Sequence, residues 1–156
     1  MIALGSNMRK TGLGPPRAVV GFAVKALAAR GLKLLDVSPI LDSAPIGPSL
    51  RRYANAAVLL ETDLQPEAML DLLQAVEGEF GRKRRGQSWR ARVLDLDIVM
   101  WSGGAFQSQH LIIPHAHFRE RDFVLLPTSA IAGEWRDPTS GLSVRHLAAR
   151  LAKITN

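Results

Sequence analysis

The chain has 156 residues, of which 47% are hydrophobic and 22% charged, the size and composition of one globular domain. No apolar run approaches the roughly 20 residues that span a bilayer, and the lack of cysteine excludes disulfides and thiolate chemistry. The formal net charge of +6 favours anionic partners: nucleotide phosphates, nucleic acid or a membrane surface. With no export signal or linker visible, we expect one domain over residues 1–156, acting as a cytoplasmic monomer.

The first half of the chain predicts three strands and a helix. Strands are expected over 1–5, 33–41 and 53–62, and turn-forming residues in 42–48 predict a loop between the last two. A helix is expected before Gly31, because apolar residues recur there at helical spacing: Val19, Phe22, Ala23, Ala26 and Leu27.

The second half adds three helices and a hairpin. A helix is expected from Pro66 to Gly81, and two more over 121–132 and 144–153. A strand over 93–101 is expected to pair with 106–113 across a turn at 102–104. Because strands and helices do not alternate strictly, we predict an α+β fold, a ferredoxin-like sandwich with a mainly antiparallel sheet covered by helices.

Two aspartates in the predicted strand 93–101 suggest a cation site. Side chains alternate along a strand, so Asp95 and Asp97 share one face while their apolar neighbours point into the core. Two such carboxylates repel each other unless a cation lies between them, and Mg²⁺ is commonly held by one or two carboxylates plus substrate phosphates. A solvated strand face, an acid paired with arginine, or a glycosyltransferase site would show the same pair.

Residues 82–92 directly before this strand carry six basic side chains in eleven positions. They fit a solvated loop, a nucleic-acid patch, or a loop that closes over a triphosphate. The adjoining acids favour the last interpretation, since phosphoryl transfer uses both metal and cationic groups. His115, which follows Pro114, is either structural or part of the site. With His117 it would suit zinc only if further ligands came from elsewhere.

Several motifs, in this order, resemble the 6-hydroxymethyl-7,8-dihydropterin pyrophosphokinases of folate biosynthesis. They occupy residues 3–7, 45–47, 53–57, 81–82, 89–98, 113–115 and 121–127, and thus cover nearly the whole chain. The resemblance implies an enzyme that transfers pyrophosphate intact from ATP to the hydroxymethyl oxygen of the pterin and releases AMP. The substrates would be these two small molecules, with neither nucleic acid nor membrane as partner.

The resemblance also implies roles for particular residues. Asp95 and Asp97 would hold two Mg²⁺ ions, and Arg82 and Arg92 would act on the phosphates. Further residues near ATP would be Leu70, Gln74, Glu77, Arg84, Trp89, Arg92, Ile98, His115 and Arg121. The pterin would contact Ser43, Pro45, Ile46, Gly47, Tyr53, Asn55, Trp89 and Phe123, with its ring between the two aromatic side chains Tyr53 and Phe123.

Some positions depart from the family pattern. Ser43 replaces the usual threonine, Ser88 replaces a basic residue, and Ala116 stands where proline or tyrosine is usual. Two alternatives therefore stay open: an RNA-binding module that uses residues 82–92, and a homologue that binds pterin without turnover.

Overall fold

The computed structural model describes residues 1–43, 51–81 and 93–155. Its centre is a five-stranded sheet in the order β2-β4-β1-β5, with β3 also paired to β4 and every pair antiparallel. The strands are β1 (Ile2–Ser6), β2 (Lys33–Val37), β3 (Leu41–Ser43), β4 (Tyr53–Glu61) and β5 (Asp95–Ile98). The long β4 therefore pairs along one side with β1 and along the other with both β2 and β3.

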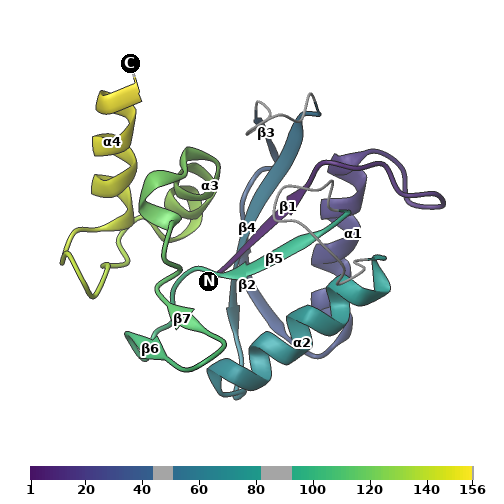
Figure 1. Ribbon diagram of the computed structural model, residues 1–156, viewed down its shortest axis with the longest axis horizontal. Coiled ribbons are helices and arrows are strands. Elements are labelled where there is room, and N and C mark those ends of the chain that lie inside the picture. Colours follow the sequence, from purple (N-terminus) through teal and green to yellow (C-terminus); the bar gives the residue numbers. More distant parts are fainter. Residues whose placement is uncertain (44–50, 82–92, 156) are drawn as a thin grey trace.

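Two helices, α1 (Pro16–Ala29) and α2 (Pro66–Glu79), cover one face of the sheet (Figure 1). Each begins with proline, which has no N–H to leave unbonded in the first turn. Their buried side chains pack against every second residue of the central strands. The main members of this first cluster are Ile2, Leu4, Val19, Ala23, Leu27, Val58, Met69, Leu73, Val76, Leu96 and Ile98.

Among the described residues, α3 (Asp122–Ala132) covers part of the opposite face, with α4 (Val144–Thr155) packed outside it (Figure 1). A short 3-10 helix, η1 (Phe118–Glu120), contacts both α3 and α4. The second cluster contains Ala3, Val99, Met100, Phe118, Val124, Leu125, Val144 and Leu147. Ala3, near the start of β1, belongs to this cluster, whereas Gly5, further along the same face of β1, does not.

The predicted fold class is confirmed. β1, α1 and β2 form one split βαβ unit with β4 inserted, and β4, α2 and β5 form a second with β1 inserted, which is the ferredoxin-like arrangement. No helix within the described ranges is long and apolar enough to cross a membrane.

Three predicted elements were wrong in detail. The strand expected over 33–41 is two strands, β2 and β3, separated by residues 38–40, where Pro39 has no N–H for a ladder. β3 also includes residues 42–43 of the predicted loop, while 44–48 lie outside the described residues. The strand predicted over 93–101 is shorter than expected and consists of β5 alone, residues 95–98.

The segment 106–113 does not pair with β5. It folds on itself, with β6 (Phe106–Gln107) against β7 (Ile112–Ile113) in a separate two-stranded sheet. Phe22, one of the apolar residues at helical spacing in α1, is 42% exposed and lies beneath the Lys25 ammonium. Val20 is buried.

Candidate functional site

Asp95 and Asp97 lie on the sheet face that α1 and α2 do not cover. Along β5 the two aspartates are half-buried, whereas Leu96 and Ile98 are buried in the first cluster. The predicted alternation is therefore confirmed. Since two residues along a strand advance about 6.7 Å, the two carboxylates stand next to each other on one surface.

A row of paired residues connects this surface with the predicted pterin residues. Gly5 on β1 pairs with Asp95 on one side and with Asn55 of β4 on the other. Paired residues share a face, and neighbouring strands lie about 4.8 Å apart, so Asn55 and Asp95 are separated by about 10 Å of backbone. Gly5 is the only residue between them in the row, and its lack of a side chain leaves that space open.

The amide of Asn55 is oriented by a neighbour. Asn55 is buried, and its Nδ2 donates a hydrogen bond of 2.8 Å to Ser43 Oγ. Ser43 pairs with Tyr53, so Ser43, Tyr53 and Asn55 occupy the same face at the β3–β4 end. A Cβ added at Gly5 would lie 3.3 Å from Asn55 Oδ1. Sequence reasoning did not single out Gly5 as a site residue, because its role depends on pairing with strands far along the chain.

His115 adds an imidazole on the other side of Asp97. Its Nε2 lies 3.9 Å from Asp97 Oδ2, and its Nδ1 accepts the main-chain N–H of His117 at 3.2 Å. Burial lowers the pKa of His115, and Arg121 and His117 lower it further against the opposing effect of the aspartates. Because Nδ1 accepts the His117 N–H, a neutral His115 ring carries its proton on Nε2, toward the aspartate.

Residues 115–121, here called the 115–121 segment, carry His115 at one end and Arg121 at the other. The N–H of His115 donates to Val99 O at 3.0 Å, which ties the segment to the residue that directly follows β5. Arg121 O accepts the N–H groups of Val124 and Leu125 and so starts α3. The guanidinium of Arg121 lies 5.8 Å from the ring centre of Phe123, which brings a predicted ATP residue and a predicted pterin residue together.

The predicted ATP residues of α2 approach β5 from its outer edge. Leu70 and Gln74 are half-buried on the stripe that leads to Glu77. Glu77 is 3% exposed, and its Oε1 accepts the N–H of Leu96 at 2.8 Å. The Ile98 side chain is buried in the first cluster, so a nucleotide would meet its main chain rather than its side chain.

Several predicted site residues lie outside the described residues, and the structure places none of them: Pro45, Ile46, Gly47, Arg82, Arg84, Trp89 and Arg92. The described members are divided between three places. Ser43, Tyr53 and Asn55 lie at the β3–β4 end, and Leu70, Gln74 and Glu77 lie on α2. The third place is β5 with the following segment up to the start of α3, which carries Asp95, Asp97, Ile98, His115, Arg121 and Phe123.

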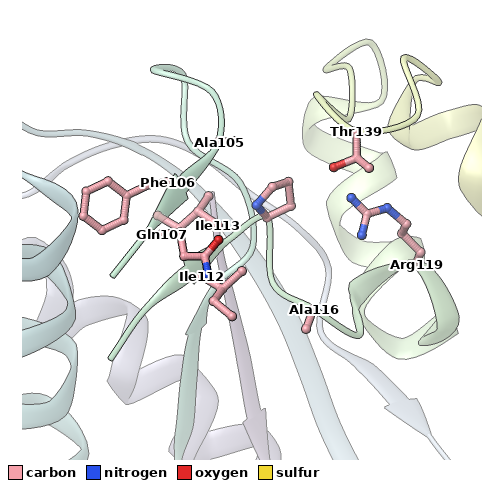
Figure 2. Close-up of a pocket in the computed structure, with 9 residues that line it drawn as sticks. Ala105, Phe106, Gln107, Ile112, Ile113, Ala116, Arg119 and Thr139 are labelled. Carbon is pink, nitrogen blue, oxygen red and sulfur yellow. The ribbon is translucent and has the colours of Figure 1, made fainter. Parts of the chain in front are cut away.

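A pocket of about 390 Å³ adjoins the 115–121 segment without including the aspartates (Figure 2). Phe106, Gln107 and Ile112 of the β6–β7 hairpin form one wall, and Arg119 and Thr139 face them across the opening. Ala116 also lines the pocket, with a short side chain.

Solved structures identify the class of fold. The chain superposes on a crystal structure of Plasmodium falciparum HPPK-DHPS with pteroate at a TM-score of 0.72, covering 97% of this chain and 42% of that one. A second HPPK-DHPS structure, in complex with substrates, gives a TM-score of 0.75 and covers 43% of its chain. Sequence identity is 13% in both, so these similarities establish the fold alone.

Sequence comparison establishes the family. The model of the 7,8-dihydro-6-hydroxymethylpterin-pyrophosphokinase (HPPK) family matches residues 1–133. The 2-amino-4-hydroxy-6-hydroxymethyldihydropteridine pyrophosphokinase of Pseudomonas aeruginosa is 38% identical over 97% of this chain and 88% of its own. The enzyme of the same name from Haemophilus influenzae is 38% identical over 89% and 84%. The chain belongs to the HPPK family and is a pyrophosphokinase, as the motifs predicted.

Proposed function

We propose that the chain transfers the pyrophosphoryl group of ATP to the hydroxymethyl oxygen of 6-hydroxymethyl-7,8-dihydropterin, with Asp95 and Asp97 as ligands of two Mg²⁺ ions. The hydroxyl oxygen would bond to the β-phosphorus and release its proton to solvent. The bond from that phosphorus to the α–β bridging oxygen would break, and its electron pair would leave with AMP. The observation that carries the proposal is the placement of both carboxylates on the open face of β5, in a chain of this family.

The donor set fits a hard cation. Asp95 and Asp97 offer oxygen atoms from adjacent positions on one face, and both remain partly accessible for a substrate phosphate to complete the shell. Bound there, Mg²⁺ would supply positive charge to the entering and leaving oxygens. His115 contributes an imidazole beside Asp97, and burial lowers its pKa from the ordinary value, which favours the neutral ring.

The polar and aromatic groups at the other end of the surface suit a pterin. Asn55 presents an amide, with its orientation set by Ser43, to the polar edge of a heterocycle. Tyr53 and Phe123 are both half-buried and offer flat apolar faces. The row Asn55–Gly5–Asp95 leads from this end to the carboxylates, so one bound molecule can span from the amide to the reacting atoms.

The direct test is AMP formation from ATP and the dihydropterin as Mg²⁺ is titrated. We expect turnover only with Mg²⁺. Asp97→Asn should lower kcat by about a thousandfold, since several kcal/mol of charge stabilisation depends on the metal and each 1.4 kcal/mol is tenfold.

Asp63→Asn is the matched control, because Asp63 is an exposed carboxylate away from the sheet face. Unchanged activity in Asp97→Asn with a normal melting temperature would disprove the metal assignment. Pterin binding without AMP formation at any Mg²⁺ concentration would show a homologue that retains the fold but not the reaction.

A further inference from the structure

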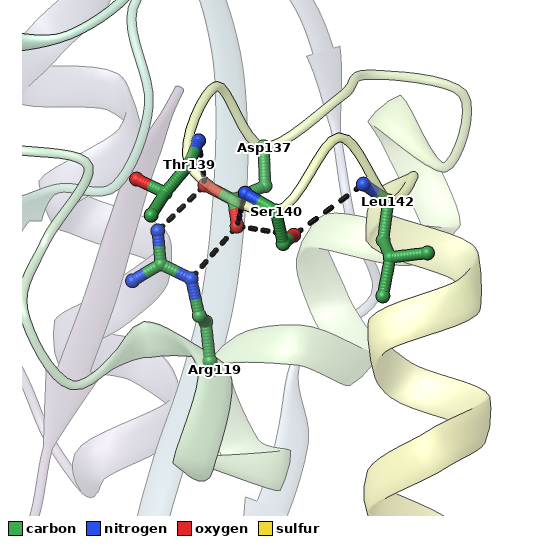
Figure 3. A network of polar contacts seen from close by, with 5 residues as sticks. All are labelled: Arg119, Asp137, Thr139, Ser140 and Leu142. Carbon is green, nitrogen blue, oxygen red and sulfur yellow. Dashed lines mark hydrogen bonds and ion pairs between the residues drawn. The ribbon is translucent and has the colours of Figure 1, made fainter.

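The 115–121 segment is anchored by an ion pair between Arg119, within the segment, and a buried carboxylate further along the chain. Arg119 extends from η1 to Asp137, which lies in the loop that joins α3 to α4 (Figure 3). Arg119 Nε donates to Asp137 Oδ2 at 2.8 Å and Nη2 donates to Oδ1 at 2.6 Å, so both carboxylate oxygens are engaged by one planar guanidinium. Such two-point pairing fixes direction as well as distance.

The carboxylate that receives Arg119 is itself held rigidly. The Asp137 side chain is 0% exposed. It also accepts the N–H of Thr139 at 3.2 Å, the N–H of Ser140 at 3.1 Å and the hydroxyl of Ser140 at 2.5 Å (Figure 3). The loop around it is closed by main-chain bonds from Asp137 N to Leu142 O and from Gly141 N to Asp137 O. Asp137 therefore provides a fixed reference point on the α3–α4 layer.

Arg119 is constrained on its other side as well. Its guanidinium carbon lies 4.6 Å from the ring centre of Phe118, and Phe118 is fully buried in the second cluster. The residue thus lies between a buried aromatic ring and a buried carboxylate. In the sequence it lies between His115 and Arg121, whose main chains are fixed by Val99 and by the start of α3.

We propose that the Arg119–Asp137 pair is a positioning device that sets where His115 and Arg121 stand relative to Asp97 and the ATP phosphates. The inference rests on the proposed function, because it assigns those two residues to the ATP side of the site. We assign Arg119 a role through the segment, because Asp137 engages its guanidinium at two points and so fixes its position. Small errors in the position of such groups are costly when a reaction depends on alignment.

The test compares Asp137→Asn, which keeps the shape of the side chain, with Arg119→Lys, which keeps the charge but not the two-point geometry. Direct titration of MgATP by calorimetry should show the Kd raised about tenfold in each variant. In steady-state assays the KM for ATP should rise similarly, while the KM for the pterin stays within about twofold. The affinity of the double variant for MgATP should be no weaker than that of the weaker single variant, because the two residues act as a unit.

Glu134→Gln is the matched control. It breaks an ion pair of 2.7 Å with Arg145 in the same α3–α4 region, but both partners are exposed and neither belongs to the 115–121 segment. The NMR resonances of the His115 ring, recorded without ligand, should move in Asp137→Asn and stay in place in Glu134→Gln.

Two outcomes would overturn the inference: an unchanged Kd for MgATP in both single variants, or equal weakening of ATP and pterin. A wild-type chain that binds MgATP but forms no AMP would refute the proposed reaction, while the same titrations would still decide the role of the pair.

Discussion

Asn55 and Gly5 show how a residue without a side chain contributes to the candidate site. The Asn55 amide donates to Ser43 through Nδ2, which directs Oδ1 toward the adjoining β1 backbone. Only glycine at position 5 leaves this space unobstructed, since a Cβ would lie 3.3 Å from Oδ1. The amide must rotate or the strands must shift to admit any larger residue.

Gly5→Ala should therefore disturb pterin recognition more than folding. We expect the KM for the dihydropterin to rise about tenfold, which corresponds to one displaced hydrogen bond of about 1.4 kcal/mol, with little change in the KM for ATP. Gly21→Ala is the control, because Gly21 lies in α1 with open space around it and alanine favours a helix. A pterin KM that stays at the wild-type value in Gly5→Ala would contradict this role.

The residues of the candidate site show which features can be predicted from the sequence and which cannot. Asp95 and Asp97 were predicted to share a face because strand alternation is a local rule, and the structure confirms it. The contacts of Asn55 with Ser43, of Glu77 with Leu96 and of Arg119 with Asp137 join residues 12 to 19 positions apart through the fold. A single sequence carries no signal for such pairs, since neither partner is distinctive by itself and Leu96 takes part only through its main-chain N–H.

At the scale of elements, α2 and β5 are joined by the buried carboxylate of Glu77. Leu96 N–H points away from β1 toward the outer edge of the sheet, where Glu77 Oε1 accepts it at 2.8 Å. Without this acceptor a buried donor would lose its partner, which costs about 1–3 kcal/mol. Glu77 therefore supports the strand that carries both aspartates, whether or not it also meets ATP.

Glu77→Ala should lower the free energy of unfolding by about 1–3 kcal/mol and speed hydrogen exchange at the Leu96 amide. Glu77→Gln should lower the free energy of unfolding by less, because its amide oxygen can still accept the hydrogen bond from Leu96 N–H. Asp71→Ala, an exposed change on the same helix, serves as the reference. Equal exchange rates at Leu96 in wild type and Glu77→Ala would show that β5 does not depend on this contact.

Element boundaries were predicted less well than element types. The helices at 121–132 and 144–153 appear as α3 and α4, because their apolar spacing is long enough to be read locally. The single strand predicted over 33–41 is interrupted at Pro39, because proline has no N–H to donate to a continuous ladder of hydrogen bonds. The pairing predicted for segment 106–113 was wrong for another reason. Pairing with 93–101 and pairing within the segment both bring apolar residues together, and the protein forms the hairpin within the segment.

For the whole molecule, one sheet packs against an apolar cluster on each face, and Asp137, in the loop between α3 and α4, pairs with Arg119 of η1. Burial by itself would raise the pKa of Asp137, but hydrogen bonds from Arg119 and Ser140 outweigh it and hold that pKa well below its usual range. A carboxyl whose pKa is lowered by folding stabilises the native state above its unfolded pKa of about 3.9. That contribution is lost as the pH falls below this value toward the folded pKa.

Urea unfolding at a series of pH values tests this linkage. At pH 6 the wild type should exceed Asp137→Asn in stability by about 2 kcal/mol, the scale of a hydrogen bond to a charged group. The difference should narrow steadily below pH 4. Glu134→Gln, which breaks an exposed ion pair, should differ from wild type by less than about 1 kcal/mol throughout. A wild-type advantage over Asp137→Asn that stays constant down to pH 2 would contradict the assignment.

The contact between Glu77 and Leu96 has a consequence for how copies of the chain meet in concentrated solution. An outer strand with unsatisfied main-chain groups can template strand addition from a second chain and so start aggregation. β5 is four residues long, and Glu77 already occupies an outward N–H of it. On the opposite side, the bulge between Leu34 and Asp36 and the break at Pro39 interrupt the β2–β3 margin. Both margins of the described sheet thus discourage the intermolecular ladders through which β-rich proteins precipitate.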